Sequence, residues 1–123
     1  MKLTKDFNRS EFDCNDGSLM PKEVLLNIQK LANQLQVLRD CLGVPITVNS
    51  GYRSTSYNKK IGGTLNSQHI LGKAADITAK GYTPAQVNAR IEQLINSGDM
   101  LQGGLGSYNK FSHYDIRKTR VRW

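Results

Sequence analysis

Only two histidines occur in this chain, and each is followed by an aspartate. Asp76 comes seven residues after His69, and Asp115 comes two residues after His113. His69, Asp76 and His113 offer two imidazoles and one carboxylate, a donor set that suits zinc and leaves its fourth position open for water. Zinc lowers the pKa of bound water and polarises a nearby carbonyl, so the chemistry that this set could support is hydrolysis of an amide.

The spacing of His69 and Asp76 alone would also fit a surface histidine and a capping aspartate. Two observations favour a metal site. His69 follows a polar, glycine-rich loop at 62–68, and Asp76 lies in an otherwise apolar segment, where an unpaired carboxylate would be costly to bury. We therefore predict that these two residues and His113 bind one zinc ion per chain.

Hydrophobic spacing and turn residues predict the helices that support this site. Pro21 begins, and Gly43 ends, a segment with apolar residues at helical spacing, which predicts a core helix over 21–42. Thr83 followed by Pro84 predicts an N-cap and the first turn of a second amphipathic helix, which ends near Gly98. A short helix is predicted over about 54 to 61.

Strands are predicted in four segments, at 44–49, 74–78, 103–106 and 111–116. The first, rich in β-branched residues, is expected to be buried, and the basic tail 117–123 is expected to add an edge. Because residues i and i+2 of a strand share a face, Asp115 should point to the same side as His113. With an irregular N-terminal arm at 1–20, the whole of 1–123 is predicted to form one α+β domain, with helices on one face of a small, mostly antiparallel sheet.

The formal net charge is +7, from 17 basic and 10 acidic residues. This charge favours an anionic partner, such as nucleic acid or an acidic cell-wall polymer. No nucleic-acid-binding motif accompanies the charge, so we expect no nucleic-acid partner. No apolar run approaches the roughly 20 residues that span a bilayer, and the first residues lack the apolar segment of a signal peptide, so we expect neither a membrane span nor a signal peptide.

The two cysteines, Cys14 and Cys41, show no metal-binding spacing and have no histidine nearby. Cys41 falls on the apolar side of the predicted helix at 21–42, so we expect a small buried side chain. A disulfide between the two cysteines is the alternative.

A longer pattern includes the residues discussed above. It consists of Ser50-Gly51-Tyr52-Arg53-Ser54, then Ser67-x-His69-x-x-Gly72-x-Ala74-x-Asp76, then His113-x-Asp115. The pattern resembles the zinc D-alanyl-D-alanine carboxypeptidases and L-alanyl-D-glutamate endopeptidases, which cut the peptide stems of bacterial peptidoglycan and share their fold with hedgehog signalling domains. The resemblance extends over about residues 7 to 117 and implies a hedgehog-like, DD-peptidase-like fold.

The resemblance also implies roles for single residues. His69, Asp76 and His113 match the zinc ligands of the family, and Arg53 matches an arginine that binds a substrate carboxylate or polarises the scissile carbonyl. Ser67 matches a polar residue at the edge of the cleft, which either contacts substrate or shapes the His69 loop.

The catalytic base is where the sequence departs from the family pattern. Many relatives carry a carboxylate three to six residues before the last ligand, or a histidine two residues before it, and this chain has neither. We therefore predict that Asp115 is the base that takes the proton from zinc-bound water. The alternative is that Asp115 orients a histidine or Arg53.

The function implied by the resemblance is a zinc peptidase acting on peptidoglycan stem peptides, with the L-alanyl-D-glutamate bond slightly favoured over terminal D-alanyl-D-alanine. The small size resembles an endolysin of phage or prophage origin, a monomer made in the cytoplasm that reaches the wall through a holin or another non-classical release. A released host enzyme would look the same. The alternative function is a catalytically silent, zinc-bound module of the same fold that binds wall peptides.

Overall fold

The computed structural model describes residues 1–123 and contains a five-stranded sheet in the order β1-β2-β4-β3-β5. Neighbouring strands are antiparallel except β3 and β5, which are parallel, so the predicted α+β fold with a mostly antiparallel sheet is confirmed. The elements in chain order are a 3-10 helix (Arg9–Phe12), α1 (Lys22–Leu42), β1 (Ile46–Ser50), α2 (Thr55–Lys60), β2 (Ala74–Ala79), α3 (Pro84–Asn96), β3 (Gly104–Ser107), β4 (Ser112–Asp115) and β5 (Val121–Arg122).

The two long helices have the boundaries that their flanking residues predict. α1 begins directly after Pro21 and ends at Gly43, which has a φ of 70°, a left-handed conformation that glycine adopts without steric cost. α3 begins after Thr83, whose hydroxyl accepts a hydrogen bond from the Gln86 amide, while the Gln86 side chain accepts one from the Thr83 amide. Residues next to the helices therefore set these boundaries, through a glycine at the end of α1 and a capping box at the start of α3.

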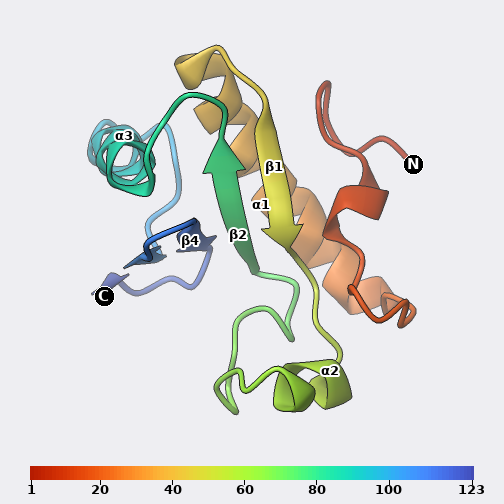
Figure 1. Ribbon diagram of the computed structural model, residues 1–123. Helices are drawn as coiled ribbons and strands as arrows, with labels where there is room; N and C mark the ends of the chain where they lie inside the picture. The colour runs from red at the N-terminus through yellow and green to blue at the C-terminus, as the bar shows by residue number, and fades with distance from the viewer.

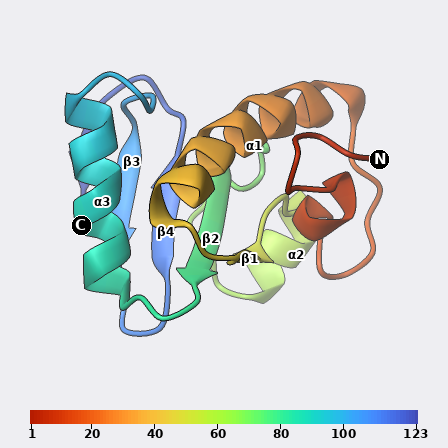
Figure 2. The ribbon, with the colours of Figure 1, turned by 90° about the horizontal axis from the view of Figure 1, so that it is seen from above.

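The sheet has one apolar face and one polar face, because successive side chains on a strand point in opposite directions. α1 and α3 lie on the same side of the sheet (Figures 1 and 2), as predicted. The core beneath these helices includes alternate residues of β2, β3 and β4, namely Ala75, Ile77, Ala79, Leu105 and Tyr114. The residues between them, Asp76 and His113 among them, point to the face that the helices leave open.

The N-terminal arm carries two phenylalanines that attach it to the core, as predicted. Phe7 and Phe12 are completely buried, with ring centroids 6.0 Å apart. The carbonyl of Phe12 accepts a hydrogen bond from the Tyr52 amide (2.8 Å), and a Cβ on Gly51 would lie only 2.7 Å from the Phe12 Cα. The arm therefore holds the segment that leads from β1 to Arg53.

Two sequence predictions about burial are wrong. β1 is not a buried strand: Ile46 and Val48 face the core, but Thr47 and Asn49 are exposed, because successive side chains point to opposite faces and the outer face of this edge strand is open. Cys41 is exposed rather than buried, because the buried stripe of α1 passes through Leu38 and Leu42 and leaves Cys41 beside it.

Two further expectations concern the cysteines and the basic tail. Both cysteines are free thiols, so the alternative of a disulfide is wrong. The basic tail does add a strand, because β5 pairs with β3. None of the helices combines the length and the apolar character needed to cross a membrane.

Candidate metal centre

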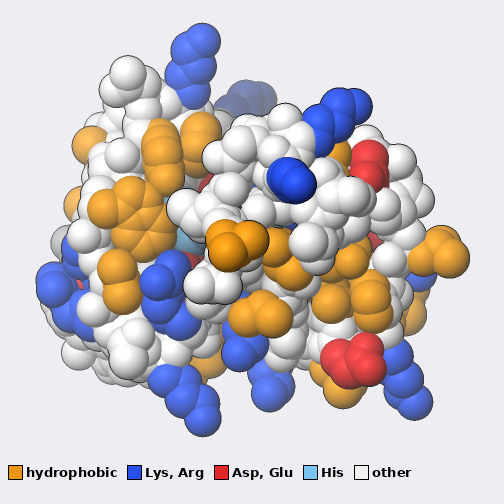
Figure 3. All heavy atoms as spheres, turned by 90° about the horizontal axis from the view of Figure 1, so that it is seen from below, with side chains coloured by type: hydrophobic (Ala, Val, Ile, Leu, Met, Phe, Trp, Pro, Cys, Tyr) orange, Lys and Arg blue, Asp and Glu red, His pale blue; other side chains and the backbone are white.

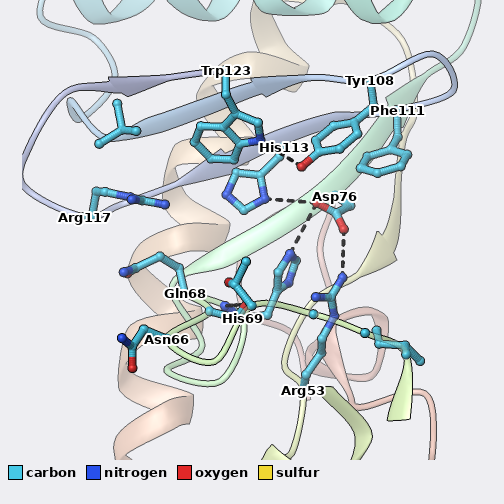
Figure 4. Close-up of a pocket in the computed structure, with 16 residues that line it drawn as sticks. Arg53, Asn66, Gln68, His69, Asp76, Tyr108, Phe111, His113, Arg117 and Trp123 are labelled. Carbon is cyan, nitrogen blue, oxygen red and sulfur yellow. Dashed lines mark hydrogen bonds and ion pairs between the residues drawn. The ribbon is translucent and has the colours of Figure 1, made fainter. Parts of the chain in front are cut away.

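The three predicted ligands come together at the open face of the sheet (Figure 4). Asp76 on β2 and His113 on β4 are direct cross-strand partners, and His69 lies in the loop that enters β2. All three side chains are buried, and one donor atom from each lies within 4.8 Å of the others. The antiparallel register of β2 and β4 therefore places two ligands side by side, and the loop supplies the third.

Two of the three separations between donor atoms are close to those of a tetrahedral zinc site. Asp76 Oδ1 lies 3.3 Å from His69 Nε2 and 3.1 Å from His113 Nδ1. Oxygen and nitrogen ligands bound at 2.0–2.2 Å to a tetrahedral zinc lie roughly 3.3–3.5 Å apart. The third separation, between the two histidine nitrogens, is at most 4.8 Å, so the three side chains surround one point at which a metal ion could bind.

Each candidate ligand is also fixed by a partner on its outer side. His69 Nδ1 lies 2.8 Å from the carbonyl oxygen of Gly51, and a proton on Nδ1 leaves Nε2 unprotonated. His113 Nε2 lies 2.7 Å from Asp115 Oδ2, and in the neutral ring a proton on Nε2 leaves Nδ1 unprotonated. The outer oxygen of Asp76 accepts a hydrogen bond from Arg53 Nη2 (3.1 Å). The outer atoms are thus occupied, and the inner atoms are available to a cation.

Asp76 is the charged group that would attract a cation. Burial raises the pKa of Asp76, but its hydrogen bonds with His113 and His69 outweigh burial and hold the pKa well below its usual range, so Asp76 stays ionised at neutral pH. Burial disfavours the charged form of His113, but hydrogen bonds to Asp115 and Asp76 raise its pKa above the ordinary value. A proton on His113 Nδ1 therefore competes with a cation for this site.

Asp115 lies on the same side as His113, as strand alternation predicts, but its carboxylate is enclosed. The side chain has no exposed surface and does not line the cleft. Its two oxygens accept five hydrogen bonds, from the amides of Gly104 and Arg117, from Arg117 Nε and Nη2, and from His113 Nε2. Burial raises the pKa of Asp115, but the hydrogen bonds from His113 and Arg117 outweigh burial and hold this pKa well below its usual range.

Arg53 is held in place by three different segments. Its Nε donates to Ser50 Oγ (3.0 Å), Nη1 points to Asn58 Oδ1 (3.4 Å), and Nη2 donates to Asp76. Asn58 is a buried residue of α2, and its amide group also donates to the Thr64 carbonyl oxygen (2.8 Å). Sequence reasoning did not single out Asn58, although a polar residue on the inner side of a short helix beside the motif arginine was a usable indication.

A cleft of about 630 Å³ opens over the metal centre. Ser67 is a buried residue of the cleft lining, and its hydroxyl accepts a hydrogen bond from the His69 amide (3.2 Å). Asp76 is the only carboxylate in the lining, which also contains Arg53 and Arg117. Figure 3 shows hydrophobic and basic side chains bordering the hollow in which a histidine is visible. Arg53 and Arg117 are each ion-paired with an aspartate, and their remaining N–H groups can donate hydrogen bonds to a ligand in the cleft.

Comparison with known proteins shows the family to which this chain belongs. Residues 2–115 match the family described as Peptidase M15. The chain belongs to this family. Over 113 residues this M15 chain is 33% identical to a zinc D-Ala-D-Ala carboxypeptidase of Streptomyces albus G, and the match covers 88% of the chain and 42% of that protein. The chain thus spans less than half the length of that relative.

A solved structure is similar to this M15 chain as well. It is the crystal structure of the Serratia marcescens L-Ala D-Glu endopeptidase ChiX, with a TM-score of 0.56 and 17% sequence identity. The likeness covers 80% of this chain and 89% of the other, and it shows a shared fold.

Proposed function

We propose that residues 1–123 form a single zinc peptidase domain that hydrolyses an amide bond in the peptide stem of peptidoglycan. The observation that carries this proposal is the convergence of His69 Nε2, Asp76 Oδ1 and His113 Nδ1, each with its outer atom already occupied. Membership of the Peptidase M15 family, and a relative named for zinc and for D-Ala-D-Ala carboxypeptidase activity, support the metal and the substrate class.

The protein residues around the metal have separate tasks in this proposal. His69, Asp76 and His113 would hold one zinc ion per chain, which when bound would supply a water of lowered pKa and polarise the scissile carbonyl. Arg53, whose planar guanidinium borders the cleft, binds a carboxylate of the substrate or the carbonyl oxygen. Ser67 lines the cleft, where it either contacts substrate or shapes the His69 loop by accepting the hydrogen bond from the His69 amide.

For Asp115, two roles are open, base or orienting group, and we favour the second. A base needs a free oxygen within reach of the water, whereas both oxygens of Asp115 are saturated by five hydrogen bonds in a fully buried position. The short contact to His113 Nε2 supports a role in fixing the ring and its tautomer.

Two amide bonds of the stem are candidates, and we place L-alanyl-D-glutamate before terminal D-alanyl-D-alanine. The setting that we propose is lysis or release at the cell wall, by a monomer of phage, prophage or host origin that reaches the wall through a holin or another non-classical release. The net charge of +7 supports attraction to the anionic wall.

Digestion of purified muropeptides, with identification of new amines by mass spectrometry, tests activity and bond choice together. We expect cleavage by the zinc-loaded protein, loss after chelation, recovery with added zinc, and no cleavage by His113→Ala. The second candidate function, a silent wall-peptide binding module, is favoured by the absence of a free carboxylate base in the cleft. Binding of muropeptides without cleavage, under zinc-replete conditions, would support that candidate and reject the peptidase.

A further inference from the structure

Trp123 is unusual in being both rigidly held and exposed. Its backbone pairs with β3, through hydrogen bonds to Leu105 and Ser107, and its indole Nε1 donates to the Tyr108 hydroxyl (2.8 Å). The ring lies against Gly106, where a Cβ would be only 2.6 Å from Trp123 Cε2. Nevertheless 46% of Trp123 remains exposed. An aromatic surface that is fixed in position and open to solvent can pack against a ligand without losing further side-chain freedom.

The indole stands beside the metal centre (Figure 4). Its ring centroid lies 4.8 Å from that of His113, and Tyr108 stacks on Phe111 with centroids 4.4 Å apart. We call Tyr108, Phe111 and Trp123 the aromatic wall, and all three line the cleft.

Polar side chains accompany the aromatic wall. The amide side chains of Asn66 and Gln68 also line the cleft, on the loop that leads to His69. The Arg117 guanidinium lies 5.5 Å from the Trp123 ring centroid. The cleft therefore combines aromatic rings with amide and guanidinium groups that can form several hydrogen bonds.

We propose that the aromatic wall, with these polar groups, is a subsite for a pyranose ring of the glycan strand to which the stem peptide is attached. This inference rests on the proposed function. A pyranose carries a face of C–H groups that packs on an aromatic ring, and its rim carries hydroxyl and acetamido groups that pair with amides and guanidinium. The substrate would then be the glycan-linked stem peptide rather than the free peptide.

The position of the wall also bears on which bond is cut. A ring packed on the indole would have its centre about 4.5–7 Å from the Trp123 ring, which itself lies next to His113. The L-alanyl-D-glutamate bond is one residue from the sugar attachment and fits this short reach. The terminal bond of a five-residue stem is three residues farther along, or roughly 10 Å. The wall thus favours cleavage close to the glycan.

Fluorescence provides a test that does not depend on activity, because Trp123 is the only tryptophan. The probe is the peptide-free disaccharide of N-acetylglucosamine and N-acetylmuramic acid, added to the zinc-loaded protein. We expect a saturable change in emission at millimolar disaccharide, with no comparable change for maltose, which lacks the acetamido groups. Unchanged emission with the disaccharide, or an equal response to maltose, would overturn the proposal.

Kinetics provide the second test, as the ratio of kcat/KM for a disaccharide-linked stem peptide to that for the same peptide without sugar. We expect wild type to prefer the linked substrate, Trp123→Ala to reduce that ratio about two- to twelvefold, and Trp123→Phe, which keeps a flat ring, to retain most of it. An unaltered ratio in Trp123→Ala would refute the subsite while leaving the peptidase intact. Disaccharide binding without cleavage of either substrate would instead reject the proposed function and leave the subsite standing.

Discussion

Replacing Asp115 by asparagine separates the two roles that this residue could have. All five groups that face the Asp115 oxygens are hydrogen-bond donors. The side-chain NH₂ of the introduced asparagine, itself a donor, must therefore face at least one of them. His113 Nε2 then loses a buried, charge-assisted acceptor, and the imidazole is free to carry its proton on Nδ1, the nitrogen that faces the metal. A hydrogen bond of this kind contributes about 1.5–3 kcal/mol, and loss of such an orienting partner typically costs 10- to 100-fold in metal affinity or activity.

We therefore expect Asp115→Asn to bind zinc about 10- to 100-fold more weakly, measured by competition with a chromophoric chelator, and to regain part of its muropeptide cleavage in excess zinc. Arg117→Met is the matched control, because it removes the guanidinium but keeps the bond between Asp115 and His113. Its zinc affinity should fall less than that of Asp115→Asn. Zinc affinity within twofold of wild type, together with a fall in kcat of more than about a thousandfold, would show that Asp115 is the base and that the orienting role is wrong.

Three further predictions follow from contacts around the site. Asn58→Leu should raise KM for muropeptides about tenfold through loss of its bonds to Arg53 and Thr64, and a parallel loss of zinc affinity would contradict this role. Glu92→Gln should lower Tm by about 2–5 °C at neutral pH, because Arg122 pairs with both carboxylate oxygens. The pairing with Arg122 lowers the pKa of Glu92, so the ion pair stabilises the fold at neutral pH and this stabilisation is lost as pH falls through the folded-state pKa. An equal fall in Tm at pH 3 would show that the ion pair is not the cause. Chelation should lower Tm, and zinc at about a thousandfold excess over Kd should restore about 4 kcal/mol of stability, whereas an unchanged Tm would mean that the site does not bind zinc.

The features of this protein that could be predicted from the sequence depend on local patterns or on the family pattern. The limits of α1 follow from Pro21 and Gly43, and those of α3 from Thr83 and Pro84, because capping acts within one turn. The meeting of His69, Asp76 and His113 follows from the resemblance to a family pattern rather than from strand geometry alone.

The features that could not be predicted depend on how segments distant in the sequence pack against one another. The enclosure of Asp115 requires Arg117 to fold back after β4, which no local propensity encodes. The support of Arg53 by Asn58 depends on where α2 lies relative to β1. Trp123 reaches the site through a two-residue strand that pairs in parallel with β3, and so short a segment has no detectable periodicity. The exposure of Cys41 follows from a small rotation of the buried stripe on α1.

The direct pairing of Asp76 with His113 has a consequence for folding as well as for chemistry. Side chains alternate along a strand, so a slip of one residue between β2 and β4 would bring Tyr114 to the cleft and turn the His113 imidazole into the apolar core. A chain paired in that way would lack one ligand and could not bind the ion with full affinity. Metal binding therefore acts as a check on strand register, because the ion stabilises correctly paired molecules and gives no such support to those that have slipped.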